Sequence, residues 1–171
     1  MPPSDLERIF AALEASGARY LVVGGVAVVL HGHLRFTADL DLTLAFDPAN
    51  VEAVLSALEA LGYRPRAPVD LRAFADADQR ADWARTKGMT VFSVWSTELP
   101  GTEVDLFVVP PVPFEPSWER RLRVDLGSSQ VNVTGLRDLI EMKRRAARVH
   151  DLEDVRALEA ILGEQENAGG E

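Results

Sequence analysis

The pattern of apolar and polar positions in the first part of the chain predicts helices alternating with strands. Apolar residues at helical spacing follow a capping box in which Ser4 is the N-cap and Glu7 the third helical residue. A second helical pattern follows Asp47–Pro48, an acceptor side chain before a proline in the first turn. The expected elements are, in order, a helix ending at Gly17, a strand at 20–23, a short helix ending near residues 31–32, a strand at 38–46 and a helix ending at Gly62.

The rest of the chain continues as a mixture of strands and helices. Pro65 and Pro68 interrupt one apolar segment, so a strand there lies at a sheet edge. Gly-Ser-Ser at 127–129 separates two short alternating segments and predicts a hairpin. Thr134 is expected to cap the next helix. The expected elements are an edge strand within 63–72, a partly exposed helix at 76–87, strands at 89–95 and 102–109, a proline-rich link at 110–116, hairpin strands at 122–126 and 130–133, and helices at 135–149 and 151–162.

These elements predict an α/β (α+β) fold in which helices pack on a mixed β-sheet and a helical pair closes the chain. We expect one domain over residues 1–163, with the C-terminal helices at 136–162. The tail at 164–171 is polar, contains glycine and is expected to be flexible. A chain of 171 residues is long enough to build its own core.

Composition narrows the class of protein. The chain has no cysteine, which excludes disulfides, thiolate metal sites and thiol nucleophiles and fits the reducing cytoplasm. Its longest apolar run, 20–30, is too short to cross a bilayer, so no membrane partner is expected. A net charge of −9 weighs against a module that binds nucleic acid without sequence preference.

Three acidic residues are the strongest chemical signal. Asp39 and Asp41 are two positions apart in an expected strand, which presents both carboxylates on one face. Close carboxylates repel each other unless a positive group lies between them, and a divalent metal ion is the obvious partner. Asp105 lies in a later expected strand. If the two strands are neighbours, the three carboxylates can hold two Mg²⁺ (or Mn²⁺) ions for nucleotidyl transfer; otherwise Asp105 lies on a solvent-facing edge.

Glycines near this acidic pair are suited to phosphate. Gly24 and Gly25 open a helix, whose first backbone N–H groups have no partner within the helix. Arg35 precedes Asp39 by four residues and either contacts a phosphate or is an ordinary surface residue. Two glycines alone are weak evidence for a phosphate site, and the acidic strand that follows them strengthens that interpretation.

A lysine on an apolar helix face is the second anomaly. Lys143 falls on the stripe of the helix at 135–149 where a core residue is expected. Its ammonium either reaches into a cleft that holds a triphosphate or snorkels to solvent. Asp151 follows near the same face and could pair with Lys143 or orient it.

Other polar and aromatic residues have plainer interpretations. His31 is expected to be a structural cap. Trp83, Trp95 and Trp118 are expected in the core or at an interface. The basic clusters at 120–123 and 143–148 are expected on solvated helix faces, with a nucleic-acid contact as the open alternative.

The run from Gly24 to Leu42, G-G-x-A-x-x-x-H-G-x-x-R-x-T-x-D-x-D-L, resembles the signature of the DNA polymerase β-like nucleotidyltransferase superfamily. Leu139–Lys143, with Arg148 and Asp151, is similar to the lysine-bearing helix of its small prokaryotic members. More narrowly, the chain resembles the AbiEii-like type IV toxin group.

The resemblance implies a metal-dependent transfer of NMP from an NTP such as ATP to a hydroxyl group of tRNA or protein. Asp39 and Asp41 would be metal ligands, and Asp105 would be the third carboxylate, helping to deprotonate the acceptor. Gly24 and Gly25 would lie under the β- and γ-phosphates, where many members have Gly-Ser. Arg35 and Lys143 would also bind the nucleotide. Thr37 and Asp151 would support these binding residues. A toxin role, with a cognate antitoxin as partner, is a further implication.

Two alternatives remain open at this point. Residues 39–43, D-x-D-x-T, also fit the nucleophile motif of haloacid-dehalogenase-like phosphatases, although there the aspartates end a strand and here they open one. A nucleotidyltransferase fold that has lost catalysis and binds a partner protein is the other alternative.

Overall fold

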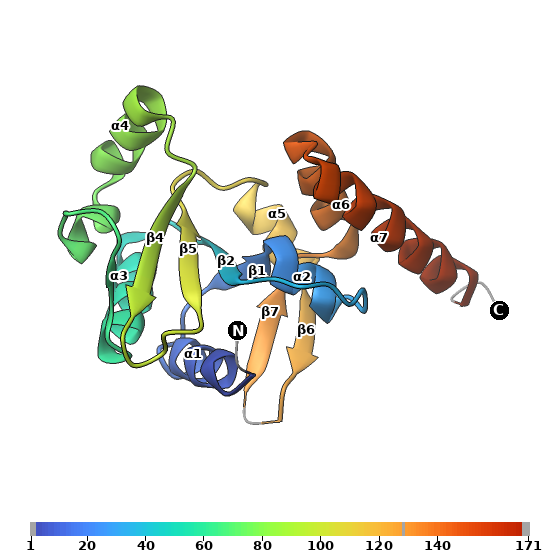
Figure 1. Ribbon diagram of the computed structural model, residues 1–171, viewed down its shortest axis with the longest axis horizontal. Helices are drawn as coiled ribbons and strands as arrows, with labels where there is room; N and C mark the ends of the chain where they lie inside the picture. The colour runs from blue at the N-terminus through green and yellow to red at the C-terminus, as the bar shows by residue number, and fades with distance from the viewer. Residues whose placement is uncertain (1–2, 128, 169–171) are drawn as a thin grey trace.

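The computed structural model describes residues 3–127 and 129–168 and shows helices packed on a seven-stranded sheet (Figure 1). The strands are β1 (Tyr20–Val23), β2 (Asp39–Leu44), β3 (Tyr63–Pro65), β4 (Val91–Ser96), β5 (Glu103–Phe107), β6 (Leu122–Asp125) and β7 (Gln130–Val133). The helices are α1 (Pro3–Ala15), α2 (Gly24–Leu30), α3 (Pro48–Ala60), α4 (Ala77–Lys87), α5 (Phe114–Glu119), α6 (Leu136–Ala146) and α7 (Val149–Ala168), with a 3₁₀ helix η1 (Leu71–Ala75).

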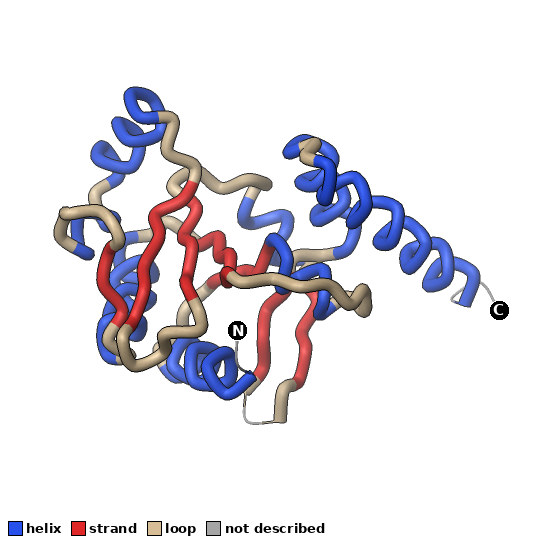
Figure 2. The backbone as a smooth tube through the Cα atoms, in the orientation of Figure 1, coloured by secondary structure: helices blue, strands red, loops and turns tan. Residues whose placement is uncertain are grey.

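The sheet is mixed, with strand order β3-β4-β5-β2-β1-β7-β6 (Figure 2). β2 lies near the middle, antiparallel to β1 and parallel to β5. β3 forms one edge, as the two prolines in its region predict. β6 and β7 form the expected hairpin at the other edge. The predicted α/β (α+β) fold with a mixed sheet is confirmed.

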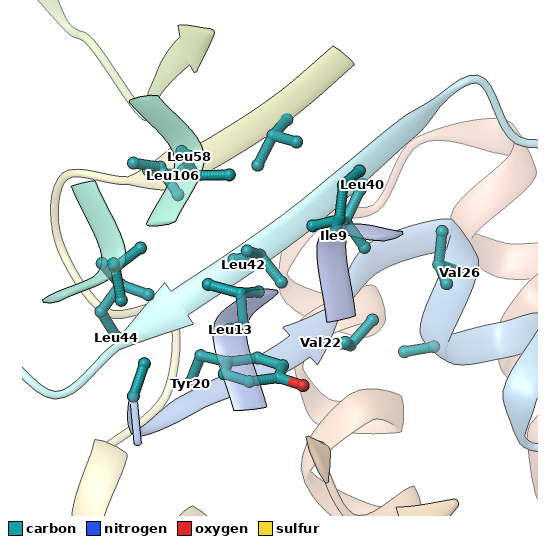
Figure 3. Close-up of a cluster of buried hydrophobic side chains, with 14 of the residues drawn as sticks. Ile9, Leu13, Tyr20, Val22, Val26, Leu40, Leu42, Leu44, Leu58 and Leu106 are labelled. Carbon is teal, nitrogen blue, oxygen red and sulfur yellow. The ribbon is translucent and has the colours of Figure 1, made fainter. Parts of the chain in front are cut away.

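One face of the sheet carries the hydrophobic core. Alternate residues of β2 and β5, such as Leu40 and Leu106, are fully buried and pack with Ile9 of α1 and Leu58 of α3 (Figure 3). Burial of one such side chain stabilises the fold by about 1.5–3 kcal/mol. The residues between them face the other side of the sheet, where Asp41, Glu103 and Asp105 are partly exposed and only Thr43 of β2 is also fully buried.

Most expected elements are present, and the first differences concern the starts of α1 and α6. α1 begins at Pro3, so Ser4 is helical and is not the N-cap; proline is well suited to the first helical turn. Thr134 does not cap α6, whose N-cap is Gly135. The Thr134 hydroxyl is buried and has no hydrogen-bond partner among the described residues.

The proline-rich link and the C-terminus contain more helix than expected. α5 begins at Phe114 inside the predicted link, because Pro116 falls in its first turn, where proline removes no intrahelical hydrogen bond. α6 ends at Ala146 and α7 runs on to Ala168, past the predicted end at Leu162. Part of the expected flexible tail is therefore helical. Ser128 of the predicted hairpin turn lies outside the described residues.

α6 and α7 lie side by side at one side of the molecule (Figure 1). The connection between them is short, and Ala147 takes the left-handed conformation (φ 52°) that ends α6. Among the helices that the structure describes, none is both long and apolar enough to cross a membrane.

Candidate active site

The three predicted carboxylates come from neighbouring strands. β2 and β5 pair in parallel, with Asp41 directly beside Asp105 and Asp39 beside Glu103. Paired positions on adjacent strands present their side chains on the same face of the sheet. All four acidic residues therefore lie on the face opposite the core. The condition on which the metal hypothesis depended, that the two strands are neighbours, is met.

Asp105 and Asp41 contact different neighbours. Asp105 turns toward β4, where the Ser93 hydroxyl donates a hydrogen bond of 2.5 Å to it. Asp41 lies in the opposite direction, against Gly24 and the backbone amide of Gly25. As a result, among the described residues no three acidic, imidazole or thiol side chains already converge as a metal site would require. The expected triad shares a surface, but its carboxylates have to rotate to share a cation.

Mutual repulsion is visible in the titration of these groups. Burial, together with the negative charges of Asp105 and Asp39, raises the pKa of Asp41 to about 7. Burial also raises the pKa of Asp105, while the hydrogen bond from Ser93 opposes that shift. Glu103 is paired with Arg66 and so does not join the group. The remaining three carboxylates form an acidic wall, which we define as Asp39, Asp41 and Asp105.

The Gly24–Gly25 turn is fitted to the acidic wall. Gly24 has φ +65°, and a Cβ atom there would lie 1.9 Å from Asp41 Oδ2. A Cβ atom on Gly25 would lie 2.5 Å from Thr37 Oγ1. Neither position can accept a side chain unless its neighbours move. Thr37 thus occupies the space in which a serine at position 25 would place its side chain.

The second wall of the site carries the cations Lys143 and Arg35, each paired with a buried carboxylate, and we call these two residues the basic wall. Lys143 is buried, and its ammonium Nζ lies 2.9 Å from both Asp151 Oδ1 and Asp154 Oδ2. Arg35 pairs with the same Asp154 oxygen. The predicted pairing of Lys143 with Asp151 is confirmed. Lys143 does not snorkel to solvent, since its side chain is only 9% exposed.

Both walls line one cavity of about 670 Å³. The acidic wall and both glycines come from the sheet side, while α6 and α7 contribute Lys143 and Asp151. Arg35 and Thr37 lie on the segment that joins α2 to β2 and complete the lining. Every residue expected at the site therefore contributes to this one cavity, whose size is typical of small-molecule sites.

Other candidate residues lie as follows. The His31 ring nitrogen Nε2 is 2.8 Å from the Thr134 carbonyl oxygen, which agrees with the structural cap. Trp83 is a core residue, as expected. Trp95 is not: its position on β4 faces the open side of the sheet, beside Arg64 and Arg66.

The basic clusters are largely satisfied within the chain. Arg120 pairs with Asp138, Arg144 with Glu159 and Arg145 with Glu141. The cluster at 143–148 lies on and just after helix α6, as expected, whereas residues 120–123 lie at the end of α5 and on β6 and are not on a helix face.

Sequence reasoning missed two contributors to the site. Asp154 joins Lys143 to Arg35, and its only signal was its spacing of three residues from Asp151, which puts both on one helix face. Ser93 holds Asp105, and its alternation with buried Phe92 and Val94 indicated a strand position but no function.

Sequence comparison places this fold in a family. The family described as a nucleotidyltransferase of unknown function (DUF6036) matches residues 4–164. The chain belongs to this nucleotidyltransferase family. Its membership confirms the resemblance to the nucleotidyltransferase superfamily, whereas the narrower AbiEii-like group is not confirmed. No curated protein matches the chain significantly.

Solved structures share the nucleotidyltransferase fold at low sequence identity. The lincosamide antibiotic adenylyltransferase LnuA, solved with lincomycin bound, has a TM-score of 0.63 at 16% identity and matches 94% of this chain and 98% of its own. ANT(2")-Ia, in complex with adenylyl-2"-tobramycin, has a TM-score of 0.60 at 14% identity, over 94% of this chain and 89% of its own. A nucleotidyltransferase-like antigenic protein from Paracoccidioides brasiliensis has a TM-score of 0.60 at 16% identity, over 95% and 78%.

The fold and the family decide against the phosphatase alternative. β2 begins at Asp39, so the D-x-D-x-T run opens a strand. The matched family and the structural neighbours are nucleotidyltransferases. The suggested activity of the chain is accordingly nucleotidyl transfer.

Proposed function

We propose that this protein transfers a nucleoside monophosphate from an NTP to a hydroxyl acceptor and that it uses divalent metal ions, Mg²⁺ or Mn²⁺. The observation that carries the proposal is the pairing of Asp41 with Asp105, with Asp39 two residues from Asp41 on the same strand face, opposite the basic wall across one cavity. A cavity with one acidic and one basic side suits a metal-bound triphosphate, in which cations and phosphates alternate.

The donor set fits a hard divalent cation. Carboxylate oxygens are the ligands that Mg²⁺ and Mn²⁺ prefer, and Asp39, Asp41 and Asp105 lie on one face of two paired strands, where Asp41 is directly beside Asp105. A shared cation would also relieve the repulsion that raises the pKa of Asp41. Metal ions held there would stabilise the negative charge on the attacking and leaving oxygens.

The other residues have roles that follow from their positions. The acceptor oxygen attacks the α-phosphorus of the NTP, and the bond from that phosphorus to the pyrophosphate leaving group breaks. The proton of the acceptor hydroxyl passes to a carboxylate. Asp105 is proposed for that proton, because it lines the cavity from the strand beside the Asp39–Asp41 strand. Lys143 and Arg35 are proposed to offset the charge of the triphosphate, with Asp151 orienting Lys143.

Thr37 is proposed to supply the hydroxyl that the Gly-Gly turn lacks. Many superfamily members are expected to have serine where this chain has Gly25, and Thr37 Oγ1 lies 2.5 Å from the position of the absent Cβ. The threonine thus places an equivalent donor at the same end of the cavity, beside the Arg35 guanidinium.

The acceptor is proposed to be a hydroxyl group of tRNA or of a protein. The structural neighbours LnuA and ANT(2")-Ia act on antibiotics according to their names, so a small hydroxylated molecule is the third class to test. A toxin role with a cognate antitoxin partner depends on a tRNA or protein acceptor.

The proposal is tested by incubating the protein with each α-³²P-labelled NTP, Mg²⁺, and total tRNA, lysate protein or an aminoglycoside. We expect label in one acceptor and release of pyrophosphate, both abolished by EDTA. Asp41→Asn and Asp105→Asn should lower the rate by at least about 10²-fold. Labelling that persists in both variants would contradict the proposed roles of these carboxylates. If no acceptor is labelled and the protein also fails to bind metal and nucleotide, a scaffold without catalysis is favoured.

A further inference from the structure

The open face of the sheet continues beyond the cavity to a second group of residues. The strand register sets two rows across β3, β4, β5 and β2. The first row contains Arg64, Trp95, Glu103 and Asp39, and the second contains Arg66, Ser93, Asp105 and Asp41. Adjacent strands are about 4.8 Å apart, so Trp95 lies roughly 10 Å from Asp39 across the sheet.

Trp95 is partly exposed and is flanked by two guanidinium groups. Arg64 lies over the indole ring, with its guanidinium carbon 4.6 Å from the ring centroid, and that of Arg66 is 5.6 Å away. Both arginines are exposed. Arg66 is held by Glu103, whereas Arg64 forms no ion pair within the part of the chain that the structure describes. We call Trp95, Arg64 and Arg66 the tryptophan platform.

The platform differs from the rest of the basic surface. Arg120, Arg144 and Arg145 are each paired with a carboxylate, whereas Arg64 of the platform has none among the described residues, and the chain as a whole is acidic. An indole beside the unpaired guanidinium of Arg64 is suited to a ligand with both a flat ring and a negative group.

We propose that the tryptophan platform is the acceptor subsite of the transferase and that it binds the single-stranded end of a nucleic acid. One base stacks on Trp95 or on the outer plane of the Arg64 guanidinium, both of which are surfaces on which unpaired bases stack. Arg64 and Arg66 pair with the flanking phosphates. This inference rests on the proposed function. A nucleic-acid end bound at the platform would have its terminal hydroxyl near the acidic wall, because both lie on the same strand rows.

The platform also explains how an acidic protein can accept a polyanion. Three carboxylates on the same face repel phosphate, so the bound end needs positive charge on both sides of the acidic wall. The basic wall provides it at one side and the two arginines of the platform at the other.

The test is binding of a fluorescein-labelled single-stranded RNA of about ten nucleotides to the full chain in Mg²⁺ buffer, followed by fluorescence anisotropy. Trp95→Ala should weaken binding about 5- to 150-fold, and Trp95→Phe should retain most of the affinity because the ring is kept. Arg64→Ala should weaken binding and reduce the slope of log affinity against log salt by about 0.7. Arg123, exposed on β6 at the far edge of the sheet, gives the matched control, and Arg123→Ala should leave the affinity unchanged.

A transfer assay separates binding from acceptor use. RNA with a free terminal hydroxyl should receive labelled NMP, RNA with a terminal phosphate should not, and Trp95→Ala should slow the transfer. The inference is overturned if wild-type protein binds metal-NTP but not RNA, or if Trp95→Ala and Arg64→Ala bind RNA like wild type. Nucleotide binding by Trp95→Ala should be unchanged. If the platform does not bind RNA, the protein still binds metal-NTP; if the proposed transferase function is wrong, it binds no metal-NTP.

Discussion

At the scale of single residues, the Gly24–Asp41 contact joins the glycine turn to the acidic wall. Gly24 is fixed by two independent constraints, its positive φ and the carboxylate that lies against it. The sequence indicated a turn at this position, but the second constraint comes from a strand that begins fifteen residues later in the chain. Only the antiparallel pairing of β1 with β2, which sets Val23 beside Asp41, reveals it.

Substitution of Gly24 should therefore affect both stability and the site. Gly24→Ala should destabilise the protein by about 2–4 kcal/mol, because about 1 kcal/mol of backbone strain adds to the displacement of Asp41. Gly17→Ala is the matched control, since Gly17 has φ +69° with nothing within 4 Å of its Cβ position, and it should show the backbone term alone. Urea unfolding measures both; equal losses would mean that the Asp41 contact is unimportant.

The Gly25–Thr37 contact gives a second residue-scale prediction. Gly25→Ser alone should be unfavourable, because the new side chain collides with Thr37, and Thr37→Ala alone should weaken binding of metal-NTP by removing a hydroxyl. The double variant restores both space and hydroxyl, and it should bind within about threefold of wild type. Calorimetric titration provides the measurement, and strictly additive losses would contradict the exchange of one hydroxyl for the other.

Asp41 should make stability depend on pH in metal-free buffer. Its folded pKa of about 7 lies above the unfolded value of 3.8, so the folded state binds the proton more tightly. Its favourable contribution is complete below the unfolded pKa and is lost as pH rises through 7. Asp41→Asn should thus be more stable than wild type by on the order of 4 kcal/mol at pH 8, and by under about 1 kcal/mol at pH 4. Chemical denaturation in EDTA at both pH values tests this; a difference that does not change with pH would refute it.

At the scale of elements, the ion pairs at Asp154 join α7 to α6 and to the segment before β2. Lys143 and Arg35 share this one carboxylate, which is nearly inaccessible to solvent. Removal of one partner of a buried pair leaves the other charges without compensation. The position of the segment that carries Arg35 and Thr37 therefore depends on α7.

Asp154→Ala should lower the free energy of unfolding by about 3–5 kcal/mol and increase amide exchange in the segment at 31–38. Glu159→Ala is the control on the same helix, because its pair with Arg144 is exposed and should contribute at most about 1 kcal/mol. If the two variants are equally stable, Asp154 does not organise the site.

The elements themselves were largely predictable from local patterns. The strand at 20–23, the helix after Asp47 and the hairpin at 122–133 follow from periodicity, capping residues and turn residues, and each is present. The errors concern helix ends: Pro3, Pro116 and Gly163 all lie within helices. Proline in a first turn loses no hydrogen bond, and the cost of a single glycine is small within the otherwise favourable helix α7.

At the scale of the whole molecule, the site depends on strand order, which local patterns do not specify. Asp39 and Asp41 share a face by alternation alone, so their partnership could be predicted. Their approach to Asp105 requires that β5 adds parallel to β2, across a connection of more than fifty residues. The same long-range order places Trp95 on the open face, where the sequence had indicated core or interface.

The central claim is that the carboxylates of β2 and β5 bind a metal-associated nucleotide. Isothermal titration of ATP, CTP, GTP and UTP into the protein, with Mg²⁺ and then with EDTA, tests it most directly. At least one nucleotide should bind in Mg²⁺ and lose at least about tenfold in affinity both in EDTA and in Asp105→Asn. Absence of binding by all four nucleotides, or binding that is the same in EDTA and in the variant, would contradict the claim.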